Sequence, residues 1–127
     1  LQGSANNATR RLALPEYEFS QTLFAPSTTA YQRFGWSISY DPKYGRVAVG
    51  SDYSKVSSYP GAVYIYQLSN DGFYSLEYME VADTDEETDA NFGESVSIQG
   101  DVIAIGASRG HGATYKSGDV YVFTAQT

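Results

Sequence analysis

The chain lacks cysteine throughout its 127 residues, which excludes disulfides, thiolate metal sites and a thiol nucleophile. It also has few cations, with 8 Lys and Arg against 15 Asp and Glu and a formal net charge of −7. Without a basic stripe we expect no nucleic-acid partner, and we interpret the negative charge as serving solubility. No apolar run approaches the roughly 18 residues of a membrane-spanning helix, so we expect no membrane span.

The sequence also lacks the apolar i, i+3, i+4 stripe of a helix in every window. What it has in quantity is aromatic residues, which make up 15% of the chain and include 12 Tyr. Large residues alternate with serines in the segment 36–40, where Trp36, Ile38 and Tyr40 flank Ser37 and Ser39. This period of two is typical of a strand with one bulky and one small face, and the sequence therefore predicts an all-β fold.

Three blocks of sequence occur twice in the same order. Their copies lie roughly 57 residues apart, a spacing typical of repeats that bury a core only by stacking on their neighbours. The blocks are Phe34–Ser39 and Phe92–Ser97, Arg46–Ser51 and Val102–Ala107, and Gly61–Tyr66 and Gly118–Phe123.

Turn residues divide each copy into short strands. The segments 41–45 and 99–100 predict hairpins between the first two strands of each copy, and Asn70-Asp71-Gly72 predicts a turn into a fourth strand at 73–79. A segment of the same type, 18–24, precedes the first copy and is also predicted to be a strand. This gives eight strands, four in the first copy, three in the second and one ahead of both.

The blocks together resemble the FG-GAP repeat, the blade unit of integrin α-subunit β-propellers and of many secreted or surface proteins. The resemblance covers about residues 19–123 and implies two antiparallel propeller-like blades, at about 35–79 and 93–124, and an extracellular or cell-surface location. The motif residues are expected to serve packing between blades, with Phe filling the gap and Gly allowing close approach. They are Phe34, Gly35, Gly50, Gly61, Phe92, Gly93, Gly106 and Gly118.

The sequence departs from the family in its turns, where integrin-type repeats often carry an Asp-rich calcium loop. The matching segments 41–46 and 99–101 offer one carboxylate each, whereas calcium takes six to eight oxygen ligands. We therefore expect a metal-free variant without a cofactor. An acidic run remains as a weaker calcium candidate, but it contains no glycine to turn the loop around an ion, and we interpret it as a solvated loop. Its acids are Asp83, Asp85, Glu87 and Asp89.

Two blades are too few, because propellers close with about four to eight. Residues 1–17 are interpreted as a polar leader and 18–127 as the two-repeat module. We expect strand 18–24 to complete a second-repeat blade, either in another copy of a cyclic oligomer or in the preceding blade of a longer parent chain. An open sandwich of two four-stranded sheets is the alternative architecture. In the leader, Asn7-Ala8-Thr9 fits a glycosylation sequon.

The candidate ligand-binding residues are aromatic. Trp36, the only tryptophan, could form a platform for a sugar or a protein together with Tyr31, Tyr53 and Tyr59, although packing between blades would also explain it. His111, the only histidine, has no nucleophile or acid at a diagnostic spacing, so we expect no enzyme. The sequence favours a recognition or adhesion module for a protein or glycan. The alternative is a structural subunit, in a homo-oligomer or a larger complex, that pairs through its blade edges.

Overall fold

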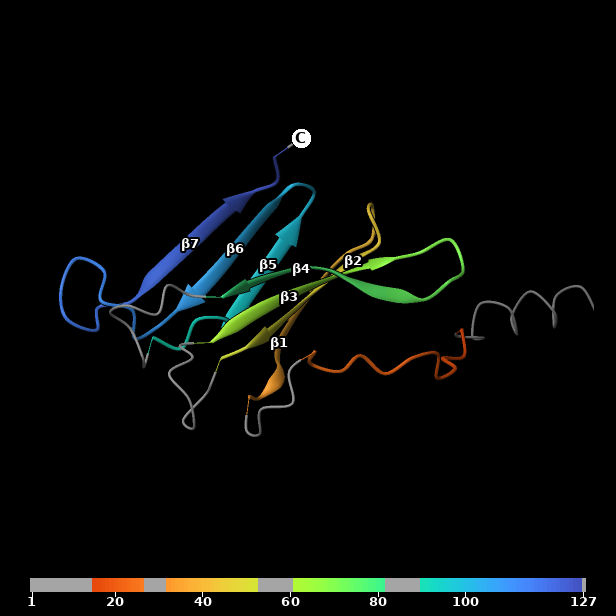
Figure 1. The fold of residues 1–127 in the computed structure, drawn as a ribbon, viewed down its shortest axis with the longest axis horizontal. Helices are drawn as coiled ribbons and strands as arrows, with labels where there is room; N and C mark the ends of the chain where they lie inside the picture. Colours follow the sequence, from red (N-terminus) through yellow and green to blue (C-terminus); the bar gives the residue numbers. More distant parts are fainter. Residues whose placement is uncertain (1–14, 27–31, 53–60, 82–89, 127) are drawn as a thin grey trace, which may run out of the picture.

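The computed structural model describes residues 15–26, 32–52, 61–81 and 90–126, and within these ranges it contains strands and no helix (Figure 1). The strands form two antiparallel sheets, ordered β1-β2-β3-β4 and β5-β6-β7. The expected all-β class with blade-like antiparallel sheets is therefore confirmed. The strands are β1 (Phe34–Asp41), β2 (Arg46–Ser51), β3 (Ala62–Leu68), β4 (Tyr74–Val81), β5 (Ser95–Gln99), β6 (Val102–Ala107) and β7 (Asp119–Thr124).

The three predicted hairpins are confirmed. In the turn between β1 and β2, the Lys43 amide donates to the Asp41 carboxylate at 2.9 Å, an Asx-type contact that closes the turn. The Phe73 amide donates in the same way to Asp71 at 3.0 Å between β3 and β4. Gly100 has a φ of 58° between β5 and β6, a left-handed conformation that favours glycine.

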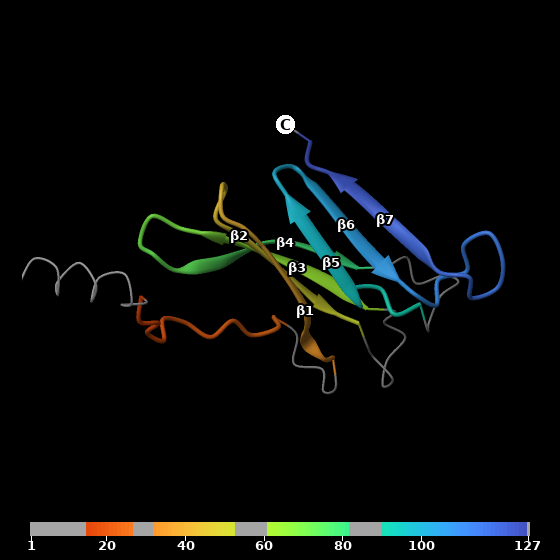
Figure 2. The ribbon, with the colours of Figure 1, turned by 180° about the vertical axis from the view of Figure 1, so that it is seen from behind.

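The two sheets approach each other along their first strands, with β5 packed against β1 and β2 (Figures 1 and 2). The small face of β1 lies in this contact. The Ser37 hydroxyl donates to the Gly93 carbonyl at 2.7 Å, and the Ile98 amide donates to the Ser39 hydroxyl at 3.1 Å. The serines thus let the second sheet come close and satisfy its backbone groups.

The main hydrophobic core lies between the sheets and includes Phe92, which is 1% exposed and is among its largest fully buried side chains. Ala48, Val63 and Ile65 of the first sheet belong to the same cluster. The Phe92 ring also meets the Tyr121 ring edge-on, with centroids 5.2 Å apart. Phe92 therefore lies buried between the two sheets.

Phe34, the counterpart of Phe92, lies on the opposite side of the first sheet. Its ring meets Tyr64 edge-on, with centroids 5.4 Å apart, within a second cluster that includes Val49 and Tyr66. We call this side of β1–β4 the outer face of the first sheet, because the second sheet covers the other side.

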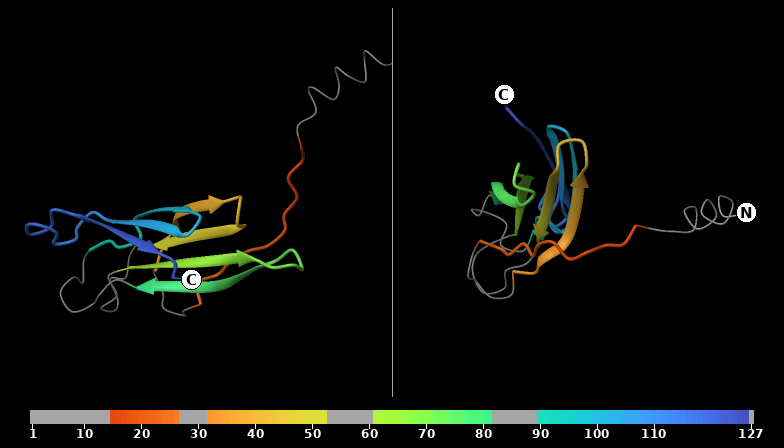
Figure 3. Two further views of the ribbon diagram at one scale, coloured as in Figure 1. Left: turned by 90° about the horizontal axis from the view of Figure 1, so that it is seen from above. Right: turned by 90° about the vertical axis from the view of Figure 1, so that its right-hand side faces the viewer.

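The prediction of a strand at residues 18–24 is wrong, because the structure assigns no strand there. The segment runs along the outer face of the first sheet, where the Gln21 side chain accepts from the Tyr74 amide at 2.8 Å and donates to its carbonyl at 2.9 Å (Figures 1 and 3). Leu23 packs into the outer cluster, and the Tyr66 hydroxyl donates to the Phe24 carbonyl at 2.9 Å. The segment thus meets the edge strand β4 through the Gln21 side chain and not through a backbone ladder.

Candidate binding surfaces

An exposed aromatic surface lies along β1 on the outer face of the first sheet. Trp36 is 55% exposed, and Ile38 and Tyr40 of the same strand face are also exposed. The Arg33 guanidinium carbon lies 3.7 Å from the centroid of the Trp36 ring, a cation–π arrangement. Arg33 and Trp36 therefore present a joint cationic and aromatic surface at the start of β1.

Asp52, directly after β2, forms an ion pair with the Arg33 side chain of this surface. Its carboxylate is almost fully buried and lies 3.5 Å from Arg33 Nε. Burial raises the pKa of Asp52, and the Arg33 charge opposes that shift. The ion pair positions the guanidinium over the indole, at the cost of desolvating a carboxylate.

We expect Asp52→Asn to increase the free energy of unfolding at pH 7. A carboxyl group whose pKa is raised on folding contributes stability below its unfolded pKa and loses that contribution as the pH rises through its folded pKa. The variant has no such charge, so its stability should vary less between pH 4 and pH 7. Urea titrations at several pH values measure this. A variant less stable than the parent at pH 7 would show that the Arg33 ion pair outweighs the burial.

Most of the other sequence candidates lie outside the described residues. This holds for Tyr31, Tyr53 and Tyr59, for the sequon at Asn7 and for the acidic run 83–89. His111 is described, and its ring lies in the loop before β7 with its centroid 5.1 Å from that of Tyr115 and the two planes tilted by 52°. Binding by Trp36 stays a prediction, although the structure places its ring at the surface.

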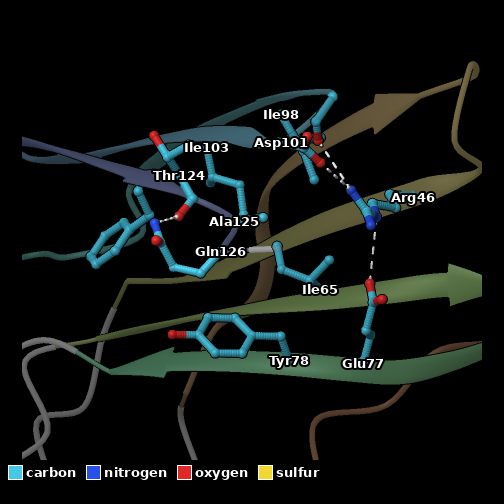
Figure 4. Close-up of a pocket in the computed structure, with 12 residues that line it drawn as sticks. Arg46, Ile65, Glu77, Tyr78, Ile98, Asp101, Ile103, Thr124, Ala125 and Gln126 are labelled. Carbon is cyan, nitrogen blue, oxygen red and sulfur yellow. Dashed lines mark hydrogen bonds and ion pairs between the residues drawn. The ribbon is translucent and has the colours of Figure 1, made fainter.

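A pocket of about 450 Å³ opens between the sheets on the side of β4 and β7 (Figure 4). Tyr78 of β4 and Ile65 of β3 line it from the first sheet, and Ile103 and Phe123 line it from the second. The first sheet has its fourth strand here, whereas the second sheet ends at β7. The pocket thus lies beside the position that a fourth strand of the second sheet would take.

Arg46 bridges the two walls of the pocket at its charged rim (Figure 4). Its guanidinium lies 3.4 Å from the Glu77 carboxylate and 3.7 Å from that of Asp101, and it donates to the Gly100 carbonyl at 3.1 Å. Sequence reasoning missed this group. The available signal was that Arg46 stands where the second copy has Val102, an unmatched charge at the start of an apolar strand.

Among the residues that the structure describes, no three or more His, Asp or Glu side chains gather as a group that could hold a metal ion. No helix in these ranges is long and apolar enough to cross a membrane.

Two stacked antiparallel sheets built from the same strand blocks define a blade-type β-repeat. Residues 77–123, from β4 through β7, match the family model of the FG-GAP repeat. The match agrees with the resemblance seen in the sequence over this part of the chain, which includes the second copy of the blocks. This repeat is a non-catalytic module of the β-propeller kind that typically occurs in extracellular or surface proteins. No curated protein matches the chain.

Proposed function

We propose that the chain is a non-enzymatic recognition or adhesion module of a secreted or surface protein, and that it binds a protein or a glycan. The observation that carries this proposal is the exposed Arg33 and Trp36 pair on the outer face of the first sheet. The second copy has Glu94 at the position of Trp36, so the scaffold does not require an aromatic ring there.

The chemistry of the pair suits both ligand classes. A flat indole face packs against the apolar face of a sugar ring, and Trp and Arg are the residues most enriched among the dominant contacts of protein interfaces. Because Asp52 already orients the guanidinium, binding would order few additional side chains.

Trp36→Ala tests this function on arrays of defined glycans and purified extracellular domains. We expect the variant to weaken binding at least about tenfold while leaving the melting temperature nearly unchanged. Tyr115→Ala is the matched control, because Tyr115 is also exposed but lies in the loop before β7, away from this face. Unchanged binding would contradict the proposal. Unfolding of Trp36→Ala would instead support packing between blades as the role of the ring.

The second candidate function is that of a structural subunit that pairs with other chains through its blade edges. A specific observation favours it, since β7 forms the edge of a sheet with three strands where the first sheet has four. An unpaired strand edge presents a row of backbone donors and acceptors to which an extended segment can add.

A further inference from the structure

We propose that copies of this chain associate head to tail. The outer face of one copy's second sheet, the side of β5–β7 turned away from the first sheet, packs on the outer face of the next copy's first sheet. Residues 18–24 of that next copy add as a fourth strand to the free edge of β7. The inference rests on the structural-subunit function proposed above and names its partner as a second copy.

The contact between the two sheets within one copy is the template. The second sheet contributes a bulky side, centred on Phe92, and the first sheet contributes a small side that includes Ser37, Ala48 and Val63. Each sheet uses one of its two sides in this contact and leaves the other side uncovered. Because both sheets are copies of the same repeat, the outer face of the first sheet should resemble the bulky half of the contact. The outer face of the second sheet should resemble the small half.

The residues on the two outer faces match this expectation. Phe34, Ile38 and Tyr64 on the first sheet correspond to Phe92, Val96 and Tyr121, the bulky half of the internal interface. On the second sheet, Val120 and Val122 correspond to Val63 and Ile65 of the small half. Val122 is 64% exposed and Val120 is also exposed, whereas their counterparts in the internal contact are buried.

Two glycines at corresponding positions, Gly35 and Gly93, have a backbone conformation that allows a facing sheet to approach closely. Gly35 and Gly93 have φ values of 91° and 90°, a conformation that side chains rarely adopt. A Cβ atom at Gly93 would lie 2.6 Å from the Ala62 carbonyl of the facing sheet. A Cβ atom at Gly35 would meet nothing within 4 Å. Gly35 thus has the same backbone conformation as Gly93, but it lacks the facing sheet that packs against Gly93.

The N-terminal segment is already in position for the missing strand. By sequence it corresponds to β4, and it lies over the outer face of the first sheet, held there by Gln21 and Leu23. A neighbour docked on that face would bring its β7 edge alongside the segment. Phe24, on the other side of the segment from Leu23, would then point toward the neighbour's pocket beside Phe123 and help to close it.

Such an interface joins different surfaces of the two copies, so it builds a ring if the rotation closes and a filament if it does not. Propellers close with about four to eight blades, and each copy supplies two sheets. We therefore expect a ring of about two to four copies.

Sedimentation analysis of the whole chain tests the assembly. The expected result is a species of about two to four times the 13.9 kDa monomer mass. Val122→Lys should reduce it to a monomer that keeps its β-sheet circular dichroism, because Val122 is exposed in the single copy. Tyr115→Lys, at a 75% exposed position outside both outer faces, should assemble like the parent. A parent that stays monomeric up to roughly 100 µM would overturn the proposal.

Mixing two variants tests the head-to-tail geometry. Val122→Lys blocks the outer face of the second sheet, and Ile38→Lys blocks that of the first, so each variant alone should be monomeric. Each retains the half that the other has lost, and an equimolar mixture should form a 1:1 dimer that grows no further. If either variant self-associates, or the mixture stays monomeric, the geometry is wrong.

The assembly and the proposed functions can fail separately. If the monomeric parent binds a different protein and Val122→Lys abolishes that binding, the structural-subunit function stands and the second copy is excluded as the partner. If the parent is monomeric and only Trp36→Ala affects binding to another molecule, the recognition function stands and the head-to-tail proposal fails.

Discussion

Phe92→Ala is expected to lower the free energy of unfolding by about 3–5 kcal/mol, the usual range for removing a fully buried Phe ring. Phe92 is 1% exposed and is the side chain through which the second sheet fills the gap to the first. Its removal leaves a cavity lined by Val63 and Ile105, which neighbouring backbone cannot fill without breaking the contact along β1 and β5. Urea denaturation followed by circular dichroism measures the loss.

Phe34→Ala is the matched control, because it removes the same ring from the other copy of the motif. Phe34 is half-buried and contacts Tyr64 and Tyr66 only on one side of the sheet. We expect a loss of about 1–2 kcal/mol. Both substitutions are best made together with Val122→Lys, so that unfolding is not linked to protein concentration. Equal losses for the two rings would show that Phe92 does not hold the sheets together.

The strands of both repeats could be predicted because their signals are local. Alternation of large and small residues and the turn chemistry at Asp71-Gly72 and Gln99-Gly100 depend only on neighbours in the sequence. The third blocks of the two copies, Gly61–Tyr66 and Gly118–Phe123, lie almost entirely in β3 and β7.

What could not be predicted depends on partners far away in the chain. The segment 18–24 has the pattern of a strand, but in the structure it contacts β4 through the Gln21 side chain and forms no backbone ladder, which the local pattern does not reveal. The charged rim of the pocket is similar, since Arg46 meets Asp101 only after the second sheet has docked.

Gly50→Ala is expected to destabilise the chain by about 3 kcal/mol, at the upper end of the usual cost of overpacking. A Cβ atom at Gly50 would lie 2.1 Å from both the Gly93 carbonyl and the Ser37 hydroxyl. The hydroxyl can rotate away, but the carbonyl belongs to the backbone of the turn directly before β5. The methyl group therefore has room only if the sheets separate, and that separation would also expose Phe92. Thermal and urea unfolding of the variant measure this effect.

Gly106→Ala is the matched control for Gly50→Ala, and it also distinguishes the internal interface from the proposed external one. A Cβ atom at Gly106 would meet the Ser95 hydroxyl at 2.2 Å and no atom of the first sheet, so a single side-chain rotation should relieve the contact. We expect the free energy of unfolding of the monomer to fall by less than about 1 kcal/mol.

In a head-to-tail assembly, however, Gly106 would face Gly35 of the next copy in the way that Gly50 faces Gly93 within one copy. The same substitution should therefore weaken self-association at least about tenfold while sparing the fold, a loss of about 1.4 kcal/mol in association. If Gly106→Ala leaves the assembly intact, the outer faces do not repeat the internal contact.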